Sequence, residues 1–357
     1  MGGAEYIPTY FLSRPSSPSR VTIRSVSLAS SRGSKGLEAR VRNRWYSRIK
    51  KLSNVLDEIH KVKGWSSKIK FLYDNLPNLK FFLSGSASLM LEKEASSDLA
   101  GRYFLVEVSP LSLKEFAELH LKKHVDIHLQ RDELERVFPL WIKRPFPEIV
   151  EWRDESRVYE YIRELVTERV VKVDLPGIYG VRGPLLSALS ELFLSNPGMI
   201  LNLSSLARDL RVGKQVLEEH LFFLEFAKII RVVKNFRPST RAESRKMKKI
   251  YPFHLALSFP YHPSLDRGKI LEALVAQRME RYWREGSREV DFIGADLQPI
   301  EVKAKEEVRA GELGSLIYFM KKYGRKEGTV VYEGTSREER INSLKINFRN
   351  IVDFLLE

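Results

Sequence analysis

The sequence contains no cysteine, which excludes disulfide bonds, thiolate zinc sites and cysteine nucleophiles. It also contains no apolar run close to the roughly 18 uncharged residues that a membrane span requires. The N-terminus lacks the apolar core of a signal peptide. We therefore expect a soluble, cytoplasmic protein that makes no membrane contact.

Basic residues outnumber acidic ones, and the formal net charge of +14 favours a polyanionic partner such as DNA. Residues 1–51 contain eleven Lys and Arg but only two acidic residues, so they carry +9 of this charge, and the other 306 residues carry +5. Because the segment is rich in Ser and Arg and has little apolar periodicity, we predict a poorly ordered basic arm over 1–54. A basic helix over 36–52 is the alternative for part of it.

The apolar patterns after the arm predict three folded segments in a chain of 357 residues. Alternating strands and helices indicate a parallel α/β unit over 55–173. Three helices followed by a strand pair indicate a winged helix over 174–252. A second α/β domain is predicted over 253–357, with a helix at 268–283, strands at 288–294 and 297–305, a helix at 312–324 and a strand at 328–334.

The first α/β unit begins with an acidic pair, Asp57 and Glu58, at the end of a strand. In an NTPase such an aspartate holds Mg²⁺ and the next glutamate polarises the attacking water. A solvated turn is the alternative. Only Val55 and Leu56 precede the pair as apolar residues, so the predicted strand is short. The elements predicted after it are a helix at 64–76, strands at 79–85 and 102–108, a helix at 112–123 and mostly helix over 131–173.

The stretches LDEIHKVKGW, LKFFLSGSASLML, LAGRYFLVEVSPLSLKEF and RPFPEIV resemble, in this order, the archaeal AAA-type ATPase family over about residues 55–173. The resemblance implies that Asp57 and Glu58 form a Walker B motif and that Ser84 lies at the polar sensor position. Arg102 resembles the family's arginine that faces the nucleotide. ATP is the nucleotide, and DNA the partner, that this resemblance implies.

The sequence departs from that family at the P-loop, where glycine-rich GxxxxGK(S/T) amides hold phosphates. SSRGSKG is the nearest stretch, but no apolar strand precedes it and no Lys-Ser or Lys-Thr follows its second glycine. We therefore predict a degenerate or lost ATP site. An intact but divergent ATPase is the alternative. The family-like sequence begins near Asn54, which suggests that another reading frame or an unrelated arm replaced the nucleotide-binding half.

The predicted winged helix places Lys214 and Gln215 on its recognition helix. The loop over 237–249 contains six Lys and Arg against Glu243, which suits contacts with DNA phosphates. A protein-interaction module with a solvated loop is the alternative. The DNA-binding candidates in this loop are Arg241, Arg245, Lys246 and Lys248.

The C-terminal domain contains an acidic residue, Asp291, followed after nine residues by Glu301 and then Lys303. Because Glu301 and Lys303 are two apart on a predicted strand, they share one face. Glu272 on the preceding helix could approach the same point. Such carboxylates bind Mg²⁺, and a lysine can stabilise the charge that develops during phosphodiester hydrolysis.

This layout resembles the restriction-type PD-(D/E)xK nuclease fold. The stretches GKILEALVAQ, YWREGSREVDFI and PIEVKAK are similar to the C-terminal domain of unknown function that accompanies these ATPases. By this resemblance Glu272, Asp291, Glu301 and Lys303 are catalytic, and Asp291 and Glu301 hold Mg²⁺. Val290 stands where the signature has proline. The alternative is an inactive core with a structural Asp291–Lys303 ion pair, acting as a DNA- or protein-interaction module.

Overall fold

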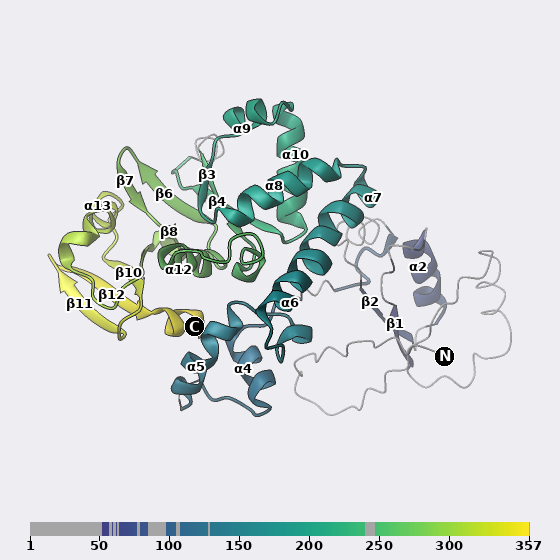
Figure 1. The fold of residues 1–357 in the computed structure, drawn as a ribbon, viewed down its shortest axis with the longest axis horizontal. Coiled ribbons are helices and arrows are strands. Elements are labelled where there is room, and N and C mark those ends of the chain that lie inside the picture. Colours follow the sequence, from purple (N-terminus) through teal and green to yellow (C-terminus); the bar gives the residue numbers. More distant parts are fainter. Residues whose placement is uncertain are drawn as a thin grey trace. The chain divides into compact units, whose positions relative to one another are not determined.

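A computed structural model describes most of the chain between residues 52 and 356, without the side chains of residues 52–54. The chain divides into two compact units, residues 1–107 and 108–357, and each is considered by itself (Figure 1). The predicted basic arm lies almost entirely outside the described residues, as do Asp57 and Glu58. The described residues are 52–56, 59, 62, 64–76, 79–84, 98–104, 108–127, 129–239 and 247–356.

The first unit contains two parallel strands connected by a helix. They are β1 (Leu52–Leu56), α2 (Trp65–Asn75) and β2 (Leu79–Leu83). Trp65 and Ile69 of α2 are buried with Ile59 and Leu99 in a small core, which confirms the predicted helix and the α/β character. The strand before Asp57 is longer than predicted, because β1 already pairs with β2 at Leu52 and not only at Val55 and Leu56.

The strand predicted over 102–108 is wrong at its described residues. Arg102, Tyr103, Phe104 and Val108 are not in a strand, and 105–107 lie outside the described residues. The backbone turns instead, because the Arg102 N–H donates to the Leu99 carbonyl at 2.8 Å. Gly101, at φ 75°, supplies the left-handed conformation that this turn needs.

The second unit begins with helices, as predicted for 112–123 and 131–173. Ser112 caps the first of them with Glu115 in the predicted capping box. The apolar faces of α4 and α5 share a core with α12 and α14, which come from the far end of the sequence. The helices and short turns are α4 (Leu113–Leu121), α5 (Arg131–Trp141), η2 (Pro147–Ile149), α6 (Glu155–Glu160), the π-helical η3 (Tyr161–Glu168) and η4 (Val170–Asp174), and α7 (Leu175–Tyr179).

The helices and strand pair predicted for 174–252 are present in the expected order. Buried leucines on one side of each helix pack against the strands in a common core. Antiparallel pairing joins β5 to both β3 and β4. The elements are α8 (Gly183–Ser195), β3 (Met199–Leu201), α9 (Leu203–Asp209), α10 (Lys214–Phe226), β4 (Ile230–Asn235) and β5 (Lys248–Pro252).

The C-terminal part contains the predicted elements in order, but its first helix is shorter than predicted, and two further strands and a helix follow the last predicted strand. The helix predicted over 268–283 ends at Ala276, because Arg281–Glu285 form strand β6, which pairs with β7 across a turn at Gly286. The elements are α12 (Arg267–Ala276), β6 (Arg281–Glu285), β7 (Arg288–Val290), β8 (Phe292–Ile293), β9 (Pro299–Lys303), α13 (Gly314–Lys322), β10 (Glu327–Tyr332), β11 (Arg337–Ile341), β12 (Leu344–Asn350) and α14 (Ile351–Leu356), with 3-10 turns η5 (Leu255–Leu257), η6 (Ala295–Leu297) and η7 (Ala310–Leu313).

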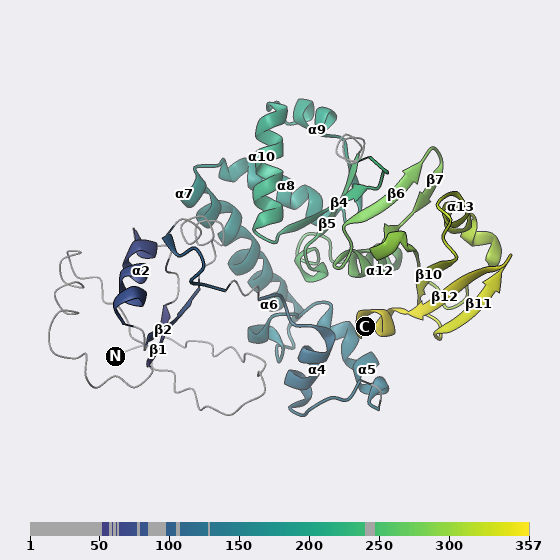
Figure 2. The ribbon, with the colours of Figure 1, turned by 180° about the vertical axis from the view of Figure 1, so that it is seen from behind.

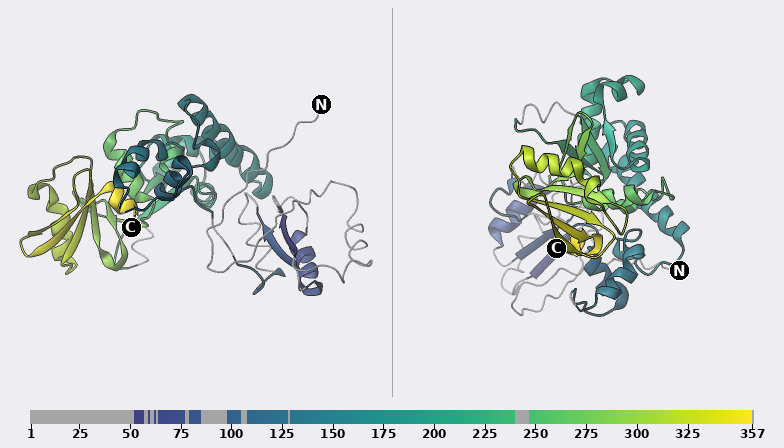
Figure 3. Two further views of the ribbon diagram at one scale, coloured as in Figure 1. Left: turned by 90° about the horizontal axis from the view of Figure 1, so that it is seen from below. Right: turned by 90° about the vertical axis from the view of Figure 1, so that its left-hand side faces the viewer.

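The strands of the second unit form two sheets. One has the order β3-β5-β4-β6-β7, and the other has the order β11-β12-β10-β9-β8 (Figure 2). The parallel pairing of β4 with β6 connects strands that lie before and after the predicted boundary at 252/253. The ribbon of α13 lies beside the strands of the second sheet (Figure 3). Its buried side chains share a core with β10 and β12 of that sheet and with β6 and β7 of the first. Among the described residues, no helix combines the length and apolar character that a bilayer crossing requires.

Candidate functional site

The structure brings together three of the residues predicted for the C-terminal site. Asp291 follows β7 directly, and Glu301 and Lys303 lie on β9. The Val302 N–H donates to Oδ2 of Asp291 at 2.8 Å, which holds this carboxylate against β9. As the spacing of two residues predicts, Glu301 and Lys303 share a face, and Lys303 Nζ donates to Glu301 Oε1 at 2.7 Å. Lys303 therefore pairs with Glu301 and not with Asp291.

Glu301 is buried, Asp291 and Lys303 are half-buried, and this burial changes their pKa values. Burial raises the pKa of Asp291 well above its ordinary value, and the nearby carboxylates of Glu301 and Glu272 raise it further. Burial also raises the pKa of Glu301, although Lys303 opposes this. Burial lowers the pKa of Lys303, but Glu301 and Asp291 more than offset this, so Lys303 keeps its proton at neutral pH.

Sequence reasoning missed three residues that complete this cluster: Lys249, Tyr251 and Glu289. Lys249 belongs to the predicted basic loop over 237–249, but it lies on β5 and its side chain is only 5% exposed. Its ammonium is 2.6 Å from Glu289 Oε1. A signal was present, because Lys249 and Tyr251 are two apart on a strand and therefore share a face.

Glu272 contacts two residues of β5, Lys249 and Tyr251, and so belongs to the same cluster. Its Oε1 is 2.9 Å from Lys249 Nζ and accepts a hydrogen bond from the Tyr251 hydroxyl at 2.5 Å. Burial raises the pKa of Tyr251, and Glu272 raises it further, so the phenol remains a donor. Burial alone would lower the pKa of Lys249, but Glu272, Glu289 and Asp291 together raise it, so this lysine is charged.

The carboxylate oxygens of the cluster are the candidate ligands for Mg²⁺. Among the described residues, no three His, Cys, Asp or Glu side chains form a ready metal-binding group. A pair remains, because Asp291 accepts a hydrogen bond from the Val302 N–H, and Val302 directly follows Glu301 on β9. Oε2 of Glu301 is buried and has no hydrogen-bond partner in the described part of the chain. Mg²⁺ is commonly held by one or two carboxylates plus water and phosphate, so Asp291 and Glu301 fit it.

The predicted nucleotide site is only partly visible. Ser84 follows β2, and its N–H donates to the Leu56 carbonyl of β1, so it lies at the strand end next to the predicted Walker B position. Asp57 and Glu58 themselves lie outside the described residues. Arg102 forms an ion pair with Asp74 of α2 at 3.1 Å. Its predicted contact with a nucleotide stays a prediction.

The predicted DNA-contacting residues lie on α10 and β5. Lys214 and Gln215 occupy the first turn of α10 and are exposed, as a contact with DNA requires. Lys248 is half-buried at the start of β5. The other candidates, Arg241, Arg245 and Lys246, lie outside the described residues.

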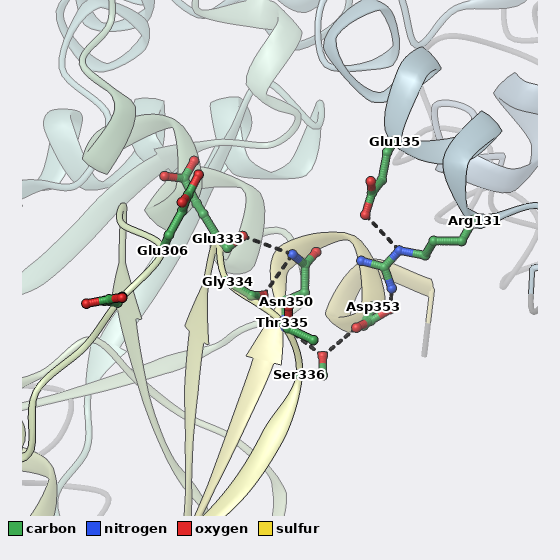
Figure 4. A pocket seen from close by; sticks show the side chains of 10 residues that line it. Arg131, Glu135, Glu306, Glu333, Gly334, Thr335, Ser336, Asn350 and Asp353 are labelled. Carbon is green, nitrogen blue, oxygen red and sulfur yellow. Dashed lines mark hydrogen bonds and ion pairs between the residues drawn. The ribbon is translucent and has the colours of Figure 1, made fainter.

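A cavity of about 560 Å³ lies in the second unit, and none of the predicted catalytic residues lines it. Figure 4 shows Arg131 of α5 between Glu135 and Asp353, and Asn350 beside the backbone of Gly334. We place the candidate site at the cluster of carboxylates and lysines, because several charged groups converge there on the buried Lys249 and Glu301. The charges around the cavity lie in more exposed ion pairs.

Models of known families match three stretches of the chain. Residues 10–117 match an AAA domain, residues 135–257 match a domain of unknown function (DUF8612) and residues 267–350 match another (DUF4143). The first match confirms the AAA-type resemblance of the N-terminal part. It starts well before Asn54, so it includes most of the predicted basic arm.

An uncharacterized protein of the archaeon Methanocaldococcus jannaschii is 27% identical to this chain over 266 residues. The alignment covers 69% of this chain and 59% of that protein, so the chain spans less than two thirds of its relative. No solved structure matches the chain.

Proposed function

We propose that this chain is an AAA-related, DNA-associated protein whose C-terminal domain hydrolyses phosphodiester bonds with Mg²⁺. One observation carries the proposal: Asp291 and Lys303, which are half-buried, converge with the buried Glu301 at β9. Two carboxylates beside a charged lysine are the groups that metal-assisted phosphodiester hydrolysis uses.

The order of elements supports this assignment. Helix α12 leads into the β6–β7 hairpin, β8 and β9 are antiparallel, and after α13 the chain returns as β10, parallel to β9. This is the helix, strands, helix and strand order expected of the restriction-nuclease-like domain that the sequence resembles. β9, which carries Glu301 and Lys303, lies inside its sheet between β8 and β10.

Each residue of the site has a distinct role in this proposal. Asp291 and Glu301 would hold Mg²⁺, which would neutralise charge on the scissile phosphate when bound. Lys303 is protonated, so it acts as a cation and hydrogen-bond donor toward a phosphate oxygen, not as a base. The Val302 N–H fixes the orientation of the Asp291 carboxylate.

The segment before this domain supports DNA association. Its order of α8, β3, α9, α10, β4 and β5 agrees with the order expected of a winged helix, in which α10 would be the recognition helix. Lys214 and Gln215 at the exposed start of α10 would contact the DNA backbone or base edges. Lys248 begins the strand that follows the predicted wing.

Cleavage of plasmid and linear DNA in Mg²⁺ or Mn²⁺ tests the proposed nuclease. Lys303→Ala should lower the rate by about 100-fold, because it removes a charge that stabilises the transition state. Lys305→Ala is the matched control, since Lys305 pairs with Glu312 outside the cluster. This variant should cleave DNA at the wild-type rate. Equal cleavage by wild type and Lys303→Ala would remove the proposed site. If Asp291→Ala also changes nothing, the domain is a non-catalytic interaction module.

A second candidate function concerns ATP. The AAA-domain match begins at residue 10 and therefore includes the segment in which a phosphate-binding loop would lie, which favours a nucleotide site. We propose that this site is degenerate, because no P-loop motif is found in the sequence. Thermal unfolding with and without Mg-ATP tests this, since a ligand that binds only the folded state raises the melting temperature. A clear rise would favour the divergent, active ATPase.

A further inference from the structure

Lys249 reaches the carboxylate cluster from β5, a strand of the neighbouring helical segment. Its ammonium lies between two acids, 2.9 Å from Glu272 Oε1 and 2.6 Å from Glu289 Oε1. It also lies over the ring of Tyr282, at 5.3 Å from the centroid. A lysine so deeply buried is stable only when paired, and these contacts provide the pairing.

The four carboxylates of the cluster fall into two pairs. Glu272 and Glu289 are bound by Lys249, and Oε1 of Glu272 accepts a second hydrogen bond from Tyr251. The other pair, Asp291 and Glu301, keeps unused oxygen atoms. Among the described residues, Asp291 accepts only the backbone hydrogen bond of β9, and Oε2 of Glu301 has no partner.

Among the described residues, the two lysines of the cluster pair with carboxylates other than Asp291. Lys249 pairs with Glu272 and Glu289, and Lys303 pairs with Oε1 of Glu301. Arg284 is 3.7 Å from Glu289 but its side chain is 41% exposed, so water screens most of its effect. One divalent cation would take Asp291 and Oε2 of Glu301 as its ligands.

We propose that Lys249 restricts this site to a single divalent ion, because its ammonium occupies the place between Glu272 and Glu289 that a second ion would need. This inference rests on the proposed function. Lys249 is a positioning residue in it, acting through Glu272 and Glu289. Glu272, predicted as catalytic from the sequence, then serves as the partner of Lys249 and not as a metal ligand.

Calorimetric titration of the full-length protein with Mn²⁺ tests the inference. The wild type should bind one ion per chain, and Lys249→Met should bind two, because Glu272 and Glu289 then lose their internal cation. Lys143→Met is the matched control, since Lys143 also pairs with a carboxylate, Glu155 at 2.8 Å, but lies outside the cluster. It should bind one ion, like the wild type.

Two substitutions that retain Lys249 test the same point if Lys249→Met does not fold. Glu272→Gln should leave the Mn²⁺ affinity within about twofold of the wild type, whereas Glu301→Gln should weaken it by about tenfold or more. Equal weakening by both would make Glu272 a ligand and overturn the inference. So would two ions in the wild type, or one ion in a folded Lys249→Met. A wild type that binds no Mn²⁺ at all would instead remove the metal-dependent function itself.

Discussion

His254 is a fully buried histidine whose ionisation should make the second unit sensitive to acid. Its Nδ1 accepts a hydrogen bond from the Ala256 N–H at 3.1 Å, so the proton of the neutral ring is on Nε2. The ring of Trp141 meets it edge-on, with the centroids 5.5 Å apart. Burial lowers the pKa of His254 to about 3. In the described part of the chain, no acidic group lies close enough to compensate a charged imidazole there.

The pKa difference sets the size of the effect. An exposed imidazole titrates near pH 6.5. Between this pH and the lowered pKa, His254 is therefore protonated in the unfolded chain but neutral in the folded chain. The stability that depends on neutral His254 is complete above about pH 6.5 and falls as the pH approaches about 3. Between pH 7 and pH 5 the loss is about 2 kcal/mol of unfolding free energy.

Urea unfolding followed by tryptophan fluorescence at pH 7 and pH 5 measures this loss. His254→Asn is the informative variant, because the Asn oxygen can accept the same backbone hydrogen bond but does not titrate. The wild type should lose about 2 kcal/mol more than His254→Asn over this range, and other titrating groups cancel in the difference. His124→Asn, at an exposed histidine, should behave like the wild type. Equal losses for wild type and His254→Asn would refute the reasoning.

Two further substitutions have definite expected outcomes. Gly334→Ala should destabilise the protein by about 1–3 kcal/mol in urea unfolding, because the new Cβ would collide with the backbone oxygen of Glu306. Gly311→Ala, where a Cβ meets nothing within 4 Å, should change it by less than about 0.5 kcal/mol, and equal effects of the two would contradict the steric argument. Asp291→Asn should raise the melting temperature at pH 7 by a few degrees. Burial raises the pKa of the Asp291 carboxyl, so ionisation of this group is unfavourable in the folded chain, whereas Asn does not ionise and can still accept the Val302 hydrogen bond. The gain should shrink toward pH 4, where Asp291 is protonated, and a lower melting temperature at pH 7 would contradict it.

Local patterns in the sequence were sufficient for most helices and strands of the second unit. The Ser112–Glu115 capping box predicted the start of α4, and the alternation in IEVK placed Glu301 and Lys303 on one face. Both depend on residues two or three apart, so no tertiary information was needed.

The errors occurred where pairing between distant strands decides the structure. The stretch from 277 to 283 continues the helical pattern of α12, but Tyr282 and Trp283 are buried in β6, which pairs with β4 and β7. Lys249 was missed for the same reason, because its partners Glu272 and Glu289 lie more than twenty residues away. Sequence spacing alone does not reveal which strand completes a site.

The parallel pairing of β4 with β6 has a practical consequence for studying the C-terminal domain in isolation. A fragment starting at residue 253 would lack β4 and leave the outer edge of β6 open, and such edges promote aggregation. It would also lack Lys249 and Tyr251, so Glu272 would lose both donors that hold it. A soluble fragment that retains the native charge balance must therefore begin before β4, upstream of Ile230.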